Sequence, residues 1–221
     1  MPHARALPAH AAAAARRECD VTDATAPVSG GSYSDERFTG LRLGGTLHGV
    51  VFRDCVFEEC DLRELRLHGC DLIDSDLLGC DLGLLDVLGS RFGGVTLEAC
   101  HVVGVVWSRA ETSGMRPLEV DFKDSVLNFS TFTSLDLRKR RFEGCTIHEA
   151  LFDGCDLRDG SFRHSDLTGT QFLNCDLRGA DLRSARHYAI VASTNRVEGL
   201  HAKLPEAVGL LAGLGIELDD G

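Results

Sequence analysis

The sequence lacks long apolar runs, cysteine pairs spaced as CxxC, glycine-rich phosphate loops and nucleophile elbows. A membrane-spanning helix needs about 18 apolar residues, so no membrane span is expected. Without CxxC pairs a zinc site has little support, and without the other two motifs neither phosphate binding nor hydrolysis is indicated. We therefore expect no catalytic, cofactor-binding or metal-binding residues, and a protein that is not an enzyme.

Positive charge is also scarce. The chain has 23 Lys and Arg against 34 Asp and Glu, a formal net charge of -11. This balance disfavours binding to nucleic-acid phosphates. We expect no direct nucleic-acid binding, and a basic partner if there is one.

What the chain has instead is a period of five. Large apolar residues fill 26 positions spaced by five, from Leu47 to Trp107 and from Phe122 to Leu182. Residues 145–183 are the most regular stretch. This period belongs neither to a helix (3.6) nor to a strand (2), so it is an internal repeat.

A coil with four flat sides of five residues would direct one large residue per side inward. Each coil would take about 20 residues, and successive coils would stack at roughly the 4.8 Å spacing of hydrogen-bonded strands. Residues 20 apart, such as Phe122, Phe142 and Phe162, would then form columns. Near Gly44 and Gly45 the period loses one residue.

Cysteine follows the same period. Eight of the nine cysteines lie two positions before a periodic apolar residue, and only Cys19 does not. We interpret them as reduced, buried, small apolar fillers, which places the protein in a reducing cytoplasm. In that setting the column of Cys60, Cys80 and Cys100 is expected to hold free thiols.

The segments CDLRD, SDLTG, CDLRG and ADLRS resemble the A(D/N)LXX motif of the pentapeptide-repeat proteins. The resemblance implies an all-β fold, a right-handed quadrilateral β-helix over residues 32–186. A short C-terminal α-helix would follow it. The motif is specific for the fold and much less so for the function.

The CDL-rich coils, the interruption after GVVW and the tail from His187 together resemble the antibiotic-resistance branch of that family. This branch includes the albicidin- and quinolone-resistance proteins that protect DNA gyrase. The resemblance implies a cytoplasmic, non-enzymatic DNA mimic that binds gyrase, with topoisomerase IV left open as a further target. The alternative is a structural or adaptor solenoid that binds an unrelated protein.

Charge is uneven along the repeat. Residues 46–107 hold 11 acidic and four basic residues, whereas residues 122–186 hold ten of each. In the second half DLR triplets place an arginine two positions after Asp136, Asp156 and Asp176, which largely neutralises those acidic columns. We therefore expect the partner-binding acidic surface in the first half, with outward side chains. Its predicted members are Asp61, Asp71, Asp74, Asp76, Asp81 and Asp86.

The interruption at residues 108–121 has two interpretations. It forms two degenerate sides within the wall, or it leaves the wall as a loop, which Gly114 and Pro117 favour. The resemblance favours the loop, and loops on rigid scaffolds often carry function. The predicted partner-binding residues of the loop are Arg109, Glu111, Met115 and Arg116.

The ends of the chain differ from the repeat. Residues 1–31 are expected to form a flexible extension whose Ala-rich start is unassigned. Residues 187–221 are expected to form a cap with a helix that begins near Pro205 and ends at Gly215. Its apolar face exceeds what one coil end needs, and the resemblance implies a homodimer through the C-terminal ends. The predicted dimer interface is Leu204, Pro205, Val208, Leu211 and Leu214.

Overall fold

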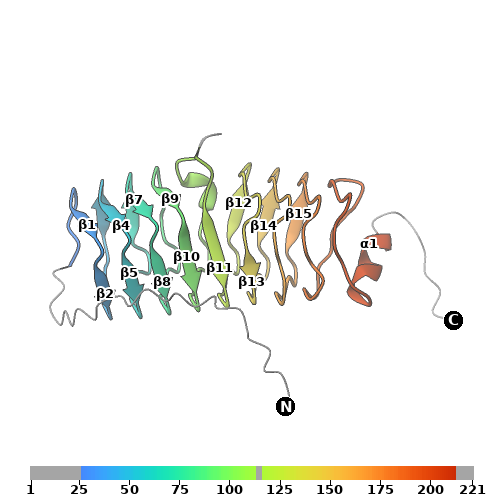
Figure 1. The fold of residues 1–221 in the computed structure, drawn as a ribbon, viewed down its shortest axis with the longest axis horizontal. Coiled ribbons are helices and arrows are strands. Elements are labelled where there is room, and N and C mark those ends of the chain that lie inside the picture. Colours follow the sequence, from blue (N-terminus) through green and yellow to red (C-terminus); the bar gives the residue numbers. More distant parts are fainter. Residues whose placement is uncertain (1–25, 113–115, 213–221) are drawn as a thin grey trace, which may run out of the picture.

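The computed structural model describes residues 26–112 and 116–212. They form a row of stacked coils along one long axis, with a short helical segment at the C-terminal end (Figure 1). The strands are β1 (Ser32–Ser34), β2 (Arg37–Thr39), β3 (Thr46–His48), β4 (Val51–Arg53), β5 (Val56–Glu58), β6 (Arg66–His68), β7 (Asp71–Ile73), β8 (Asp76–Leu78), β9 (Arg91–Gly93), β10 (Val95–Glu98), β11 (Val120–Lys123), β12 (Thr131–Thr133), β13 (Phe142–Glu143), β14 (Leu151–Asp153) and β15 (Gln171–Leu173). The helical elements are η1 (Trp107–Arg109), η2 (Glu206–Val208) and α1 (Gly209–Ala212).

All the strand pairs are parallel and join one coil to the next. The sheets have the orders β1-β4-β7-β9, β13-β11-β10-β8-β5-β2, β12-β14-β15 and β3-β6, and isolated bridges continue the ladders between them. The central residue of most strands is buried and its two neighbours are more exposed. The fold is therefore the all-β quadrilateral β-helix predicted from the period of five.

Coil length changes at two places. Ser32 pairs with Val51, 19 residues on, whereas Thr46 pairs with Arg66, 20 residues on. The lost residue lies where the period slips, near Gly44 and Gly45. Val95 pairs with Val120, 25 residues on, so one coil contains five residues more than its neighbours.

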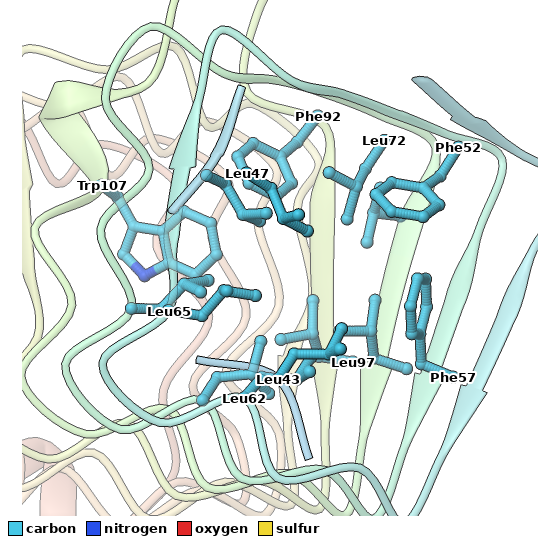
Figure 2. Close-up of a pocket in the computed structure, with 15 residues that line it drawn as sticks. Leu43, Leu47, Phe52, Phe57, Leu62, Leu65, Leu72, Phe92, Leu97 and Trp107 are labelled. Carbon is cyan, nitrogen blue, oxygen red and sulfur yellow. The ribbon is translucent and has the colours of Figure 1, made fainter. Parts of the chain in front are cut away.

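The core changes its chemistry halfway along the axis. Leucines fill most of the first half, whereas the second half has two stacked phenylalanine columns, such as Phe132 and Phe152, with ring centroids 4.6 Å apart. Trp107 lies at the boundary and stacks on Phe132. Figure 2 shows it among the side chains that line an apolar cavity of about 20 Å³ inside the first coils. That is the space of one water rather than of a ligand.

The ladder extends beyond the boundaries expected for the repeat. At the first coil the Gly30 amide donates to the His48 carbonyl, so the coil begins before residue 32. At the other end Asp181 pairs with His201, so residues assigned to the cap belong to the last coil. The helical segment from Glu206 to Ala212 follows. Residues 1–25 and Gly215 lie outside the described residues.

Candidate partner-binding surface

The predicted wall acids lie immediately before inward-facing residues of the period. Asp71 and Asp76 are the first residues of β7 and β8, and Asp61, Asp81 and Asp86 form bridges in the other ladders. Each is partly exposed while the next residue is buried. Their side chains therefore face outward, as expected from the alternation of a strand.

Four of these acids hold ion pairs. Asp61 contacts Arg42 at 3.0 Å and Arg63 at 2.8 Å, and Arg63 also reaches Asp81 at 3.6 Å. The hydrogen bond from Arg63 lowers the pKa of Asp61 well below its usual range. The wall of the first half, which the charge count predicted to be the acidic surface, is thus partly neutralised.

The other two of these four acids, Asp71 and Asp86, hold ion pairs in other ladders of the solenoid. Asp71 contacts Arg91 at 3.5 Å. Asp86 contacts both His68 and Arg109 at 3.1 Å. Arg109 was predicted as a loop residue that binds a partner, and in the structure it lies against an acid of the wall.

The surplus negative charge is located at the corners of the coils. Residues 26–112 still hold 14 Asp and Glu against seven Lys and Arg. Five of these acids occupy corner positions with positive φ and are exposed: Asp35, Asp54, Glu59, Glu64 and Asp74. Among the described residues none of the five has an ion pair. Of them only Asp74 was predicted.

Asp35, Asp54 and Asp74 occupy the same corner on successive coils. Their backbone amides donate to the carbonyls of Arg53, Ile73 and Gly93, one coil further on. The three carboxylates therefore repeat at roughly the 4.8 Å spacing of the coils. The sequence signal for such a column is an acid two positions after a periodic apolar residue, which was not used in the prediction.

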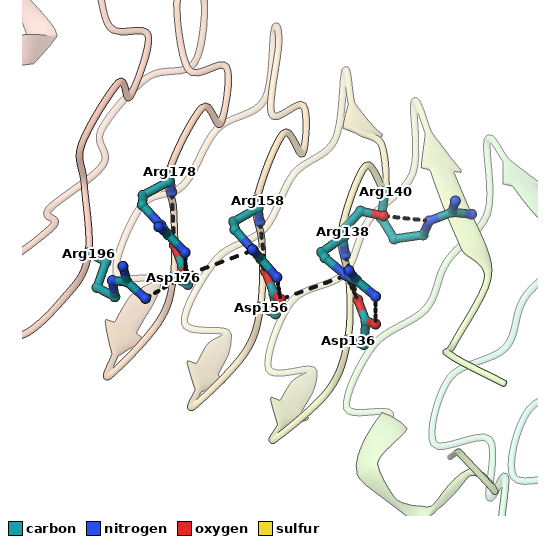
Figure 3. Close-up of polar contacts among 8 residues, drawn as sticks. All are labelled: Asp136, Arg138, Arg140, Asp156, Arg158, Asp176, Arg178 and Arg196. Atoms are coloured by element: carbon teal, nitrogen blue, oxygen red, sulfur yellow. Dashed lines mark hydrogen bonds and ion pairs between the residues drawn. The ribbon is translucent and has the colours of Figure 1, made fainter. Parts of the chain in front are cut away.

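The second half carries a neutralised ladder instead. Arg138, Arg158 and Arg178 each donate two side-chain hydrogen bonds to the aspartate two positions before (Figure 3). Arg138 also reaches Asp156 on the next coil at 3.7 Å. The hydrogen bonds from the arginines lower the pKa of Asp136 and Asp176. This face presents alternating charge, as the DLR triplets predicted.

The 25-residue coil, which begins at Val95, protrudes at one edge of the solenoid. The segment around η1 rises above the neighbouring coils (Figure 1), while Trp107, Ala110 and Leu118 remain buried. The apolar residues that flank the interruption therefore stay in the wall. Glu111 and Arg116 are exposed at the two ends and line a cleft of about 180 Å³ beside Arg91. Met115 lies outside the described residues.

The C-terminal end exposes apolar side chains. Leu204 is 70% exposed, Val208 is also exposed, and Pro205 lies between them at the start of η2. Leu210, by contrast, packs against the core. Leu211 is partly buried, and Leu214 lies outside the described residues. The backbone amide of His187 donates to Glu206, which fixes the segment to the last coil.

No group of three or more His, Cys, Asp or Glu residues in ranges 26–112 and 116–212 is arranged to hold a metal ion. Within the same ranges no helix has the length and apolarity needed to cross a membrane.

Comparison with known proteins identifies the repeat. A family model described as Pentapeptide repeats matches eight copies over residues 47–83 and 147–183. A search of curated proteins found no match.

Solved structures of similar shape include a trypsin-treated form of QnrB1, a plasmid-mediated fluoroquinolone resistance protein. It has 21% identity and a TM-score of 0.41, and the match covers 86% of this chain and 92% of that one. HetL, a pentapeptide repeat protein involved in heterocyst differentiation regulation in Nostoc sp. strain PCC 7120, has 20% identity and a TM-score of 0.37. The match covers 78% of this chain and 84% of that one.

Proposed function

We propose that this chain, two stretches of which match the model of pentapeptide repeats, is a non-enzymatic DNA mimic. Its partner is DNA gyrase, which it protects from a gyrase-poisoning antibiotic. Topoisomerase IV is a second target to test. The proposal starts from the resemblance of the coils, the interruption and the tail to the antibiotic-resistance branch.

One observation carries the proposal beyond the resemblance. The corners of the first half hold exposed carboxylates that form no ion pair within the described part of the chain, and three of them stack along one edge. An enzyme surface built to bind a phosphate backbone presents basic side chains at regular spacing. A rigid row of carboxylates complements such a surface and raises the association rate through long-range attraction.

The neutralised second half has a different role in this proposal. Its alternating Arg and Asp side chains keep the wall soluble without adding net charge. The exposed apolar residues at the C-terminal end would join two copies, which doubles the length of the rod. The first half of each copy would then lie at the outer ends and contact gyrase.

The test is a supercoiling assay with purified gyrase and either albicidin or a fluoroquinolone. Addition of the protein should restore supercoiling at a drug concentration that stops the enzyme. A variant with Asp35, Asp54 and Asp74 changed to Asn should restore less, and the effect should weaken as salt rises. No restoration at any protein concentration would contradict the proposal.

A second function is favoured by a separate observation. Leu84 and Phe129 are large apolar residues exposed on the coil corners, which is a feature of protein-binding surfaces rather than of a phosphate mimic. An adaptor solenoid with an unrelated partner would use such residues. A pull-down that recovers another protein and lacks gyrase would favour this alternative.

A further inference from the structure

At two turn positions of the solenoid a large apolar residue has a backbone conformation that disfavours large side chains. Leu84 and Phe129 have φ values of 56° and 60°, the left-handed region that large side chains rarely adopt. Their side chains are 61% and 62% exposed. Most other positive-φ positions of the described chain hold Gly, Asp, Asn or another polar residue.

The two residues belong to the same edge of the solenoid. The amide of Leu84 donates to Val103 and the amide of Gly104 donates to Asn128, so Leu84, Gly104 and Phe129 occupy one corner on three successive coils. A Cβ on Gly104 would lie 2.8 Å from Cδ2 of Leu84. The Leu84 side chain therefore covers Gly104 and leans toward Phe129.

A third apolar residue lies beside this corner. Val106 follows Gly104 by two residues, pairs with Thr131 in the ladder and is 41% exposed. Leu84, Val106 and Phe129 are thus three exposed apolar residues on or next to this edge, and we name them together the Leu84 corner. The Phe129 ring stacks on none of the other rings of the described chain, although most phenylalanines there do.

Local stability does not explain the Leu84 corner. A left-handed conformation is unfavourable for a residue with a Cβ relative to its preferred conformations. Exposed leucine and phenylalanine side chains recover little of this by burial. A residue whose backbone is strained and whose side chain gains no stabilisation from packing is a candidate for a functional role.

A glutamate lies along this edge at each end of the stretch from Leu84 to Phe129. Glu64 precedes Leu84 on the same corner and Glu149 follows Phe129, because the amides of Glu64 and Phe129 donate to Gly83 and His148 on the adjacent coils. Both glutamates are exposed. They are four coil spacings apart, about 19 Å at the usual strand separation.

We propose that the Leu84 corner is a docking site for a basic protein segment with apolar side chains. The apolar side chains cover Leu84, Val106 and Phe129, and basic side chains on either side reach Glu64 and Glu149. Burial of one leucine-sized side chain supports a gain of about tenfold or more in affinity, so apolar contact should dominate the selection among basic segments. The site does not require that gyrase be the partner.

Two synthetic peptides test the site on the full chain. One is a short lysine-rich peptide with two leucines, and its twin has serine at both leucine positions and the same charge. Binding is measured by fluorescence anisotropy of the labelled peptides. The leucine peptide should bind at least about tenfold more tightly, the ratio that burial of one such side chain supports.

Variants locate the effect. Leu84→Asn with Phe129→Asn should abolish the preference for leucine, whereas Leu173→Asn, at an exposed apolar residue elsewhere on the wall, should retain it. Asparagine tolerates positive φ, so the double variant should melt no lower than the wild type. Glu64→Gln with Glu149→Gln should weaken both peptides equally at low salt.

Three results would overturn the inference. One is equal affinity for both peptides, and another is a preference that survives in the double variant. The third is self-association of the wild type, lost in the double variant, because the occupant would then be a second copy. A negative supercoiling assay with a positive peptide result would reject gyrase protection and keep the docking site.

Discussion

The Ser165 hydroxyl accepts a hydrogen bond from the backbone amide of Cys145 on the previous coil at 2.9 Å. It also donates to the carbonyl of Phe142 at 2.6 Å. Ser90 and Cys70 repeat this arrangement. The small residues two positions before the large ones therefore satisfy backbone groups inside the coil, where no water reaches them. The thiols also donate hydrogen bonds, so the interpretation of cysteine as an apolar filler was incomplete.

Replacement of Ser165 by Ala should destabilise the solenoid. It leaves the Cys145 amide and the Phe142 carbonyl unpaired in a buried site, which costs about 1–3 kcal/mol of unfolding free energy. Urea denaturation measures the change. Ser184→Ala is the matched control, because Ser184 accepts the same kind of bond from the His164 amide in an exposed site. Equal losses in the two variants would contradict the explanation.

Replacement of phenylalanine by alanine should affect stability strongly at a buried position and weakly at an exposed one. Phe152 is fully buried between Phe132 and Phe172, with ring centroids 4.6 Å and 5.1 Å away. Phe152→Ala should lower the unfolding free energy by about 3–5 kcal/mol. Phe129→Ala should change it by less than about 0.5 kcal/mol, since exposed positions lose little. Similar melting temperatures for the two variants would contradict this placement of the rings.

The fold could be predicted because the period of five repeats one physical requirement. Every coil must bury one large residue per side, so the pattern survives local exceptions such as the missing residue near Gly45. The 25-residue coil was ambiguous for the same reason. An insertion of five residues preserves the register, and the sequence alone does not say whether Glu111 or Arg116 continues the ladder.

The candidate site was harder to predict. The charge count located the acidic half, but ion pairs such as Arg63 with Asp81 join residues on different coils, and the prediction compared neighbours in sequence. Apart from Asp74, the corner acids and the Leu84 corner were missed because the prediction considered the acids that precede a periodic residue and not the positions two after it. Because the backbone has positive φ at these positions, the residue type found there carries information about function.

Acid should destabilise the second half through its aspartates. The hydrogen bonds from Arg138 and Arg178 lower the pKa of Asp136 and Asp176 below the unfolded value of about 3.9. Such groups stabilise the fold above that value, and the contribution is lost as the pH falls towards the folded pKa. Unfolding free energy should therefore decrease from about pH 5 downwards. Asp136→Asn with Asp176→Asn should flatten the curve, and high salt should do so in part.

The control for the acid series is Asp159→Asn. Asp159 lies at a corner of the same half with positive φ and has no ion pair among the described residues. This variant should keep the slope of the wild type. If the slope of the double variant matches it too, then the arginine ladder does not cause the pH dependence.

The corner acids should matter more for gyrase than the wall acids. The triple change of Asp35, Asp54 and Asp74 to Asn removes exposed charges and breaks no ion pair between residues that the structure describes, so affinity should fall by about tenfold or more at low salt. The matched control changes Asp136, Asp156 and Asp176 to Asn, three acids of the neutralised ladder. It should leave the affinity within about twofold. Surface plasmon resonance at two salt concentrations measures both, and equal losses would contradict the assignment.

The C-terminal end should hold the dimer together through Leu204 and Val208. Both are exposed in a single copy, and burial of such side chains against a second copy contributes about 1.5–3 kcal/mol each. In a dimer with twofold symmetry both copies carry the substitution, so each new residue occurs twice in the interface. Leu204→Glu with Val208→Glu would therefore bring four carboxylates together, and light scattering should give the mass of a monomer.

The positions chosen keep this last test separate from folding. Leu210 packs against the core and Leu211 is partly buried, so a charge at either would disturb the cap as well as the interface. Leu173→Glu is the control, since it adds the same charge to an exposed apolar residue on the wall, and it should remain a dimer. A wild type that is monomeric at all concentrations, or a double variant that stays dimeric, would place the interface elsewhere. If the double variant is monomeric and still protects gyrase, one copy of the acidic half is sufficient for binding.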